Sequence, residues 1–380
     1  MKRGVFIISE DLDNGVIQSQ VLNQIKFLRK HKICEFIILI CFWDNEQVEK
    51  SKKLSSNFEK YYNTKIFFLK IMTPKLIFSD FINSNRLSVF FSKLKYKIDY
   101  IHARTDLCAV ISFNLKKKTK AKLIWDCRGY GPAEIDYENN RILNFLKRRY
   151  LQYRFNYACK ISDKVIVVSS FLMTLVQRIK KDNVFLIPSA ASSSSFYFDE
   201  KKRFMKRKEL QINAKDLVFV YSGSLKRYQM FDETIRFFKS ILRKRNNAIL
   251  LILTKDTSIA REKVSKIKNV KVMSIKHQEV NSYLNASDLA IMIRKKDMTN
   301  KAASPTKFAE YCLTGLDVIT NTSEMDYLNM NKEVNNIHNF ESKYFSIDSL
   351  KKSNRKKTAS YYKTKISKEA FINTYKKLYE

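Results

Sequence analysis

Two short stretches in the second half of the chain combine a turn, hydroxyl groups and cations in a way that suits a phosphate ligand. The first follows a strand-like run at 218–222 and contains Gly223, Ser224, Lys226 and Arg227. A glycine permits a tight turn, and the amides after it can point at an anion near a helix start. Lys226 and Arg227 would add direct charge to a diphosphate. An ordinary strand-to-helix turn with two surface cations remains an equal alternative.

The second stretch contains Ser304, Pro305, Thr306, Lys307 and Glu310. Ser304 is expected to cap a helix whose first residue is Pro305. The free amides at the start of that helix, with the hydroxyls of Ser304 and Thr306, make a second helix N-terminus that can bind a phosphate. Lys307 would help to neutralise the phosphate or would point to solvent. A carboxylate at Glu310 can accept hydrogen bonds from both hydroxyls of a ribose. The alternative for a lone glutamate is a solvent-facing or salt-bridged side chain.

The elements that must position these residues are short apolar strands that alternate with amphipathic helices. The expected strands lie at 5–9, 36–42, 66–69, 100–103, 123–127, 164–168, 184–187, 218–222, 248–253, 270–274, 289–293 and 318–320. Continuous apolar strands separated by helices are typical of parallel sheets that are covered on both faces. Ligands of such folds bind at the carboxyl ends of the strands, so function is expected in the loops after them.

The order of these elements predicts an α/β protein with two Rossmann-like, doubly wound parallel-sheet domains that face each other across a cleft. The first domain is expected at 1–190 and the second at 211–345. A stretch rich in Ser and Ala followed by a basic tract predicts a linker at 191–210. Residues 346–380 are expected to form helices that pack back on the N-terminal domain.

The two phosphate-compatible stretches also carry a family resemblance. Residues 304–311 with Gly315 and 318–319, residues 222–224 with 228–229, and the intervening 285–289 resemble the donor-binding signature of the retaining glycosyltransferases of family 4. The resemblance covers roughly 215–325. It implies a GT-B fold in which the N-terminal domain at 1–190 binds the acceptor and the domain at 211–345 binds a nucleotide sugar. The donor would be a UDP- or GDP-sugar, with no cofactor and no obligatory metal. The resemblance also implies that Glu310 binds the ribose, while Lys226 or Arg227, with Ser304 and Thr306, faces the diphosphate.

The resemblance extends more loosely to the first half of the chain. Asp126 and Arg128 match a loop at the acceptor side, with a structural Asp–Arg pair as the alternative. Gly15 stands where the family keeps a glycine loop near the donor. Many members carry a further glutamate at the position of Ala302. Asp297, the only acid in the loop 294–300, is the candidate that would replace it in catalysis.

The composition predicts a polyanionic binding partner and a reducing compartment. The chain has 72 Lys+Arg against 37 Asp+Glu, a formal net charge of +35. Such a charge indicates an anionic membrane surface, nucleic acid or phosphorylated substrates, unless it is a general Lys bias. Its six cysteines show no close pair typical of a metal or redox site, so no metal is expected. We expect a cytoplasmic protein, with peripheral docking on the inner face of the cell membrane as a further possibility.

The sequence therefore predicts a glycosyltransferase that moves a sugar from a nucleotide sugar to a glycan or lipid-linked oligosaccharide in cell-surface polysaccharide biosynthesis. The resemblance implies a retaining, metal-independent reaction. A nucleotide-sugar epimerase on the same fold is one alternative, although its acid and base residues cannot be assigned. A non-catalytic, basic nucleic-acid-binding or regulatory protein is another, although no nucleic-acid-binding motif is recognisable and no nucleic acid is expected.

Overall fold

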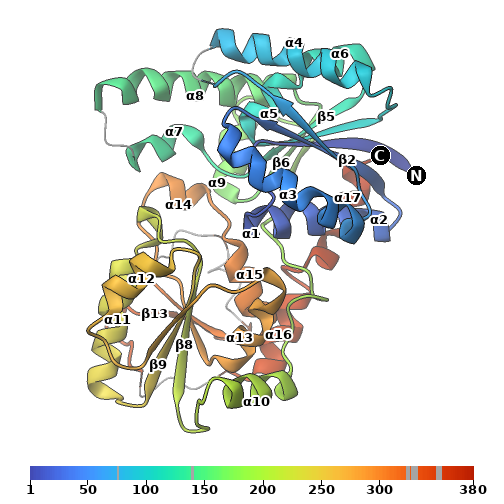
Figure 1. The fold of residues 1–380 in the computed structure, drawn as a ribbon. Helices are drawn as coiled ribbons and strands as arrows, with labels where there is room; N and C mark the ends of the chain where they lie inside the picture. Colours follow the sequence, from blue (N-terminus) through green and yellow to red (C-terminus); the bar gives the residue numbers. More distant parts are fainter. Residues whose placement is uncertain (75–76, 138–140, 322–325, 327–332, 348–352) are drawn as a thin grey trace. The chain divides into compact units, whose positions relative to one another are not determined.

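The computed structural model describes residues 1–74, 77–137, 141–321, 326, 333–347 and 353–380. The chain forms two compact units. The first comprises Met1–Pro188, Lys301–Ser304 and Phe371–Glu380, and the second comprises Ser189–Asn300 and Pro305–Ala370. Each unit is built on one parallel sheet with helices on its faces (Figure 1), which confirms the predicted class of two parallel-sheet α/β domains.

The sheet of the first unit has the strand order β3-β2-β1-β4-β5-β6-β7. Its strands are β1 (Lys2–Ile8), β2 (Cys34–Phe42), β3 (Ile66–Lys70), β4 (Tyr100–Arg104), β5 (Lys122–Cys127), β6 (Lys164–Val167) and β7 (Val184–Leu186). Every described pairing in it is parallel. Because β1 pairs with both β2 and β4, the winding reverses there, and the carboxyl ends of β1 and β4 flank the switch point of this sheet.

Alternation along the strands explains why both faces of this sheet are covered. Val5 and Ile7 pack into one apolar cluster, whereas Phe6 and Ile8 pack into another on the opposite face. The helices of the unit are α1 (Gly15–Ile17), α2 (Asn23–Lys30), α3 (Asn45–Tyr62), α4 (Ile77–Lys93), α5 (Thr105–Ile111), α6 (Phe113–Thr119), α7 (Gly131–Glu134), α8 (Arg141–Ile161), α9 (Ser170–Gln177) and α17 (Ile372–Leu378), with a π-helical turn at Gln18–Leu22. Helices α2 and α17 contribute to the second cluster, and α5, α8 and α9 contribute to the first.

The sheet of the second unit has the order β10-β9-β8-β11-β12-β13. Its strands are β8 (Leu217–Ser222), β9 (Ala248–Leu253), β10 (Val270–Met273), β11 (Leu289–Ile291), β12 (Asp317–Thr320) and β13 (Ile337–Asn339). The sequence predicted all of these except β13. The helices are α10 (Glu200–Glu209), α11 (Phe231–Lys244), α12 (Thr257–Val264), α13 (Val280–Ala286), α15 (Thr306–Leu313) and α16 (Arg355–Lys363). Helix α14 (Met298–Ala302) begins in this unit, and its last two residues belong to the first. The winding reverses between β8 and β11, so the loops after these two strands flank the switch point.

The linker predicted at 191–210 is wrong, because most of this stretch is a structured part of the second unit. Asp199 caps α10 by accepting a hydrogen bond from the Lys202 amide at 2.9 Å. Arg203 lies 2.6 Å from one carboxylate oxygen of Asp288, and Arg207 lies 3.4 Å from the other. The same carboxylate accepts a hydrogen bond from the amide of Val218, near the start of β8. The basic tract is therefore anchored by ion pairs rather than left in solvent.

The predicted C-terminal segment divides between the units. Helix α16 lies in the second unit, whereas Phe371–Glu380, including α17, belongs to the first. The hydroxyl of Tyr379 is hydrogen-bonded to Nδ1 of the buried His102 on β4 at 2.6 Å. Residues 348–352 of the same segment lie outside the described residues.

Gly315 ends α15 in a conformation that no other residue would adopt there without strain. Its φ is 71°, in the left-handed region. The amides of Gly315 and Leu316 donate to the carbonyls of Cys312 and Tyr311, both at 3.0 Å, which closes the last turn of the helix. A Cβ atom at Gly315 would lie 2.2 Å from the carbonyl oxygen of Arg355. The chain can therefore turn from α15 into β12 only with a glycine here.

Gly315→Ala should lower the free energy of unfolding by about 2 to 4 kcal/mol, because it adds left-handed strain and a clash with backbone. Urea unfolding followed by circular dichroism measures the change. Gly15→Ala is the matched control, since nothing lies within 4 Å of a Cβ atom there and the change should be within about 0.5 kcal/mol. Equal stability of the two variants would contradict this account of the α15–β12 turn.

Candidate functional site

The turn after β8 is shaped around the ammonium group of Lys307. Gly223 has a φ of 139°, and a Cβ atom on it would lie 3.0 Å from Lys307 Nζ. Lys307 Nζ donates a hydrogen bond of 2.7 Å to the Oε1 atom of Gln229, which comes from the short 3-10 turn Arg227–Gln229. The structure therefore brings the two predicted stretches together, and Gly223 leaves the room that the lysine needs.

Hydrogen bonds from neighbouring elements hold this turn in place. The hydroxyl of Tyr221 donates to the carbonyl of Ser224 at 2.7 Å, and the Leu225 amide donates to Asp256 at 2.9 Å. From α15, the hydroxyl of Tyr311 accepts a hydrogen bond of 3.0 Å from the Ser222 amide. The end of β8 is thus fixed by the same helix that carries Lys307.

Helix α15 starts one residue later than the sequence predicted. Thr306 is its first residue, and Pro305 is the N-cap, with an extended backbone. The expectation that Ser304 caps the helix and Pro305 is its first residue is therefore wrong. A proline has no side-chain acceptor, so it gives no side-chain cap to the first-turn amides. The donor-binding roles expected for Ser304 and Thr306 stay predictions.

Lys307 is held in surroundings that disfavour its positive charge. Burial lowers the pKa of its ammonium well below the ordinary value, and the nearby Arg294 lowers it further, whereas Glu310 opposes the shift. The ammonium also lies 4.8 Å from the ring centroid of Tyr221, a favourable but weak contact. A bound anion would restore the charged form of this lysine.

Glu310 is buried rather than solvent-facing. Only 7% of its surface is exposed. Burial raises the pKa of its carboxyl to about 7, and the neighbouring Lys307 pulls that pKa down. A carboxyl that titrates near neutral pH in a protected place is typical of a functional group.

Arg294 is a third member of the site, which the sequence analysis did not identify. It follows β11 closely, and only 4% of its surface is exposed. Its backbone exchanges two hydrogen bonds with the side chain of Asn321, and its guanidinium donates to the side chain of Asn300 at 3.3 Å. Its Nε atom is buried and has no hydrogen-bond partner among the residues that the structure describes. An arginine that directly follows a strand at the switch point was the only signal in the sequence.

The remaining donor-side candidates are more exposed than Glu310 and Arg294. Lys226 and Arg227 are exposed. Asp297 accepts hydrogen bonds from the backbone and side-chain amides of Asn300, at 2.9 and 3.2 Å, and so caps α14. The roles expected for these three residues stay predictions.

In the first unit, Asp126 and Arg128 form part of a buried ionic network. Arg128 Nε lies 2.7 Å from one carboxylate oxygen of Asp126, and His102 Nε2 lies 3.5 Å from the other. Burial works to raise the pKa of the Asp126 carboxyl, but Arg128 and His102 outweigh it and hold that pKa below its usual range. Asp126 has no exposed surface. This geometry supports a structural pair, and the catalytic role of both residues stays a prediction.

Gly15 begins α1 directly after Asn14, whose side chain accepts a hydrogen bond of 2.9 Å from the Val16 amide. Nothing lies within 4 Å of a Cβ atom on Gly15. Neither packing nor backbone conformation therefore requires a glycine at this position, and its role near a donor stays a prediction.

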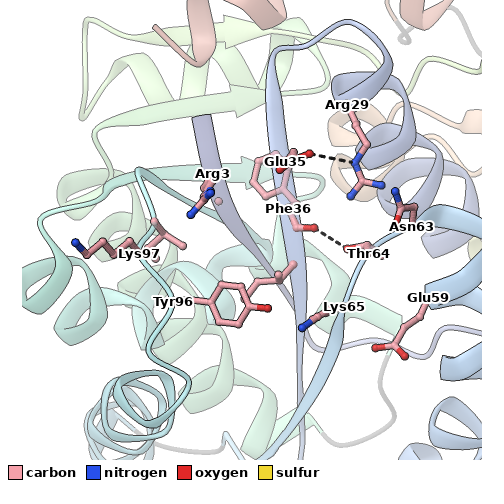
Figure 2. A pocket seen from close by; sticks show the side chains of 13 residues that line it. Arg3, Arg29, Glu35, Phe36, Glu59, Asn63, Thr64, Lys65, Tyr96 and Lys97 are labelled. Atoms are coloured by element: carbon pink, nitrogen blue, oxygen red, sulfur yellow. Dashed lines mark hydrogen bonds and ion pairs between the residues drawn. The ribbon is translucent and has the colours of Figure 1, made fainter. Parts of the chain in front are cut away.

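A pocket of about 500 Å³ opens at the amino ends of strands β1 to β3 in the first unit (Figure 2). Three of its polar side chains already have partners. Arg29 donates to the Tyr62 carbonyl at 3.0 Å, Thr64 donates to the Phe36 carbonyl at 2.6 Å, and Glu59 accepts from the Ile66 amide at 2.7 Å. The amino ends of parallel strands lie opposite the edge where ligands of such sheets bind, so we do not assign the function here.

Two further observations concern metals and membranes. Among the described residues, no group of three or more His, Cys, Asp and Glu side chains could hold a metal ion. In the same part of the chain, no helix has both the length and the apolar character needed to cross a bilayer.

Comparison with known proteins identifies the architecture. No protein-family model and no curated protein sequence matches the chain. The solved structure of sucrose-phosphate synthase from Thermosynechococcus elongatus matches at a TM-score of 0.71, over 100% of this chain and 98% of its own, with 12% identity. The chain has the GT-B fold. A glycosyltransferase from Rickettsia africae matches this GT-B chain at 0.67, over 99% and 98%, with 14% identity.

Structures with bound nucleotides share the same GT-B architecture. Anabaena HepE in complex with UDP-glucose matches at a TM-score of 0.64, over 100% of this chain and 93% of its own, with 11% identity. A UDP-GlcNAc 2-epimerase from Neisseria meningitidis matches at 0.52, over 100% and 94%, also with 11% identity. At such low sequence identities, the similarity to these structures shows a shared fold alone.

Asp126→Asn should destabilise the protein by roughly 3 kcal/mol at neutral pH, because Arg128 would keep its buried charge without a counter-ion. Urea unfolding measures the change. Asp136→Asn is the matched control, since Asp136 forms an exposed ion pair with Arg148 and such pairs contribute about 0 to 1 kcal/mol. An unchanged stability of Asp126→Asn would instead favour the acceptor-side role of this carboxylate.

Glu310 should also make stability depend on pH in an unusual direction. Its pKa in the folded chain is about 7, above the ordinary 4.5, so the unfolded chain loses this proton first as the pH rises. The carboxyl therefore destabilises the fold increasingly between these two values. Glu310→Gln removes this titration, so it should gain roughly 3 kcal/mol relative to the unsubstituted chain between about pH 4.5 and about pH 8.

Urea unfolding of both chains at several pH values measures this gain. Glu262→Gln, at an exposed glutamate of the same unit, should show none. A difference between Glu310→Gln and the unsubstituted chain that stays constant with pH would contradict the raised pKa.

Proposed function

We propose that this chain is a glycosyltransferase whose second unit binds the nucleotide-sugar donor. One observation carries the proposal. At the switch point of that unit, the half-buried Lys307 and the buried Arg294 act on each other unfavourably, and Glu310 is the acid that offsets the charge of Lys307. A diphosphate in the loops after β8 and β11 would balance the excess positive charge. Proteins of the same fold bind UDP-glucose and other nucleotide sugars.

Each residue of the site has a role in this proposal. Lys307 and Arg294 contact the diphosphate, and Glu310 accepts hydrogen bonds from the ribose hydroxyls. Gly223 lets the backbone of the turn approach the phosphates. Ser304, Thr306 and the first-turn amides of α15 complete the anion site. Ser224, Lys226 and Arg227 contact the outer side of the donor.

The same charges suit the transfer chemistry. Glycosyl transfer passes through an oxocarbenium-like state in which negative charge develops on the leaving nucleoside diphosphate. Lys307 and Arg294 are able to stabilise that charge directly, and preorganised charges in a protected site are effective catalysts. We therefore propose a metal-independent reaction without a cofactor, which retains the anomeric configuration. In this proposal Arg128, positioned by Asp126, meets the acceptor, and Asp297 contacts the transferred sugar.

The acceptor we propose is a glycan or a lipid-linked oligosaccharide in cell-surface polysaccharide biosynthesis, and the place of action is the cytoplasm at the inner face of the cell membrane. The net charge of +35 supports an acceptor that lies at an anionic surface.

A nucleotide-sugar epimerase is the second candidate, because an enzyme of that kind shares the fold. The products distinguish the two. A transferase releases a nucleoside diphosphate only when the acceptor is present, whereas an epimerase converts the nucleotide sugar without any acceptor. Chromatography of a nucleotide sugar incubated with the protein, with and without membrane extract, gives the answer. Neither product, in folded protein, would favour a non-catalytic role.

Lys307→Met and Glu310→Gln should each weaken binding of the matching nucleotide sugar by roughly 10- to 100-fold, because each removes a buried, charged contact. Isothermal titration calorimetry with UDP- and GDP-sugars, in the presence of EDTA, measures this effect. Arg227→Ala should have a smaller effect, since its side chain is exposed.

The exposed Lys266 and Glu262 of the same unit provide controls: Lys266→Met and Glu262→Gln should bind as the unsubstituted chain does. If the folded Lys307→Met and Glu310→Gln variants kept full affinity, the donor site would have to lie elsewhere.

A further inference from the structure

Helix α4 of the first unit has its polarity inverted. The side chains that it buries are mainly polar, namely Ser79, Asp80, Asn83, Ser84, Leu87, Ser88 and Phe91. The side chains on its outward face include Phe78, Phe81 and Val89, which are 68%, 63% and 56% exposed. A surface helix of a globular protein normally shows the opposite arrangement.

Specific hydrogen bonds hold α4 in this orientation. The Asn83 side chain accepts from the Met72 amide at 2.7 Å and donates to the Met72 carbonyl at 2.8 Å. Ser84 accepts from the Asn114 amide of α6 at 3.1 Å. Because rotation of the helix would leave these buried polar groups without partners, the outward apolar face is a stable property of the fold.

Helix α8 continues the apolar surface. Asp80 of α4 accepts a hydrogen bond of 2.7 Å from the Tyr150 hydroxyl and pairs with Arg154, so the two helices are joined side by side (Figure 1). Among the side chains that α8 exposes are Leu143, Phe145, Leu146 and Tyr153. Exposed aromatic and aliphatic side chains on adjacent helices are typical of an interaction site.

Helices α6 and α8 also expose basic side chains. Helix α8 exposes Lys147 and Arg149 as well as Arg148, which pairs with Asp136, and α6, which packs on α4, exposes Lys117 and Lys118. The only acid in the sequences of α4, α6 and α8 is Asp80, which is buried against Arg154. The outward face of the three helices therefore combines apolar anchors with positive charge.

We propose that this face of α4, α6 and α8 docks on an anionic lipid bilayer. Phe78, Phe81 and Leu146 would enter the boundary between headgroups and acyl chains, and the flanking lysines and arginines would bind lipid phosphates. A second copy of the chain is a poorer fit, because a two-fold contact would bring two basic faces together. Nucleic acid is a poorer fit because it offers nothing to the aliphatic side chains. The surface lies outside the donor site, so its test needs no turnover.

Vesicle flotation tests the proposal with the full chain and two lipid mixtures, phosphatidylcholine alone and phosphatidylcholine with phosphatidylglycerol. The unsubstituted chain should float with the anionic vesicles. Phe78→Ser with Phe81→Ser should lower that binding at least roughly tenfold, since each ring loses its apolar burial. Lys147→Glu with Arg149→Glu should lower it by roughly tenfold or more, and the loss should shrink as salt is added.

Matched controls come from the second unit. Phe204→Ser with Met205→Ser removes two side chains that are exposed on α10, and Lys239→Glu with Lys244→Glu makes the same charge change on exposed residues of α11. Both control variants should bind vesicles as the unsubstituted chain does. Circular dichroism and donor binding, measured in parallel, show that each variant is folded and separate this proposal from the donor site.

Three outcomes would overturn the proposal. One is undiminished vesicle binding by the folded Phe78→Ser/Phe81→Ser variant. Another is equal loss of binding in the α10 and α11 controls, which would indicate a general charge effect. The third is that the unsubstituted chain does not bind vesicles and forms a dimer, which the Phe78→Ser/Phe81→Ser variant dissociates. That result would show that the face is a contact between subunits.

Discussion

The arrangement of the second unit depends on one constraint, which is the placement of the Lys307 ammonium beside a residue without a side chain. Any Cβ atom at Gly223 would meet that ammonium at 3.0 Å. The turn after β8, the start of α15 and the 3-10 turn that carries Gln229 are therefore fitted to one another. The fit places a cation where the protein itself supplies little compensation, since Arg294 adds a second positive charge nearby. A site that is costly when empty and is relieved by an anion is a strong physical reason to expect one.

The first unit uses buried charge in the opposite way. Asp126 has a cationic or polar partner on each oxygen, and Tyr379 completes the chain of contacts through His102. The tautomer of His102 with its proton on Nε2 satisfies both neighbours, since Nδ1 then accepts from the Tyr379 hydroxyl. Compensated charge of this kind rigidifies a fold and ties the last helix to the sheet. The contrast between the two units helps to separate a binding site from a structural network.

Much of this arrangement could be predicted from the sequence, because it depends on local patterns. Apolar strands separated by helices predicted the two sheets. Turn chemistry pointed to Gly223, and the family resemblance pointed to Glu310. What failed depends on distant partners. The tract 191–210 has the composition of a linker, and contacts with distant residues, such as its ion pairs with Asp288, make it part of the unit. The only local signal for Arg294 is its place after a strand, and its side chain and backbone are held by the more distant Asn300 and Asn321. The start of α15 differs from the prediction by one residue, which is within the range by which helix ends vary.

The orientation of helix α4 also depends on distant partners, so it could not be predicted from the sequence. Periodicity reveals that a helix has two different faces, but it does not reveal which of them is inside. Hydrophobicity alone would place Phe78 and Phe81 in the core and Asn83 and Ser84 in solvent. The structure reverses that choice because Met72 and Asn114 offer hydrogen bonds to the polar face. The net charge indicates an anionic partner without saying where it would bind. Buried hydrogen bonds orient the helix so that its apolar side chains face outward. In our proposal, the basic residues of α6 and α8 add positive charge to that surface.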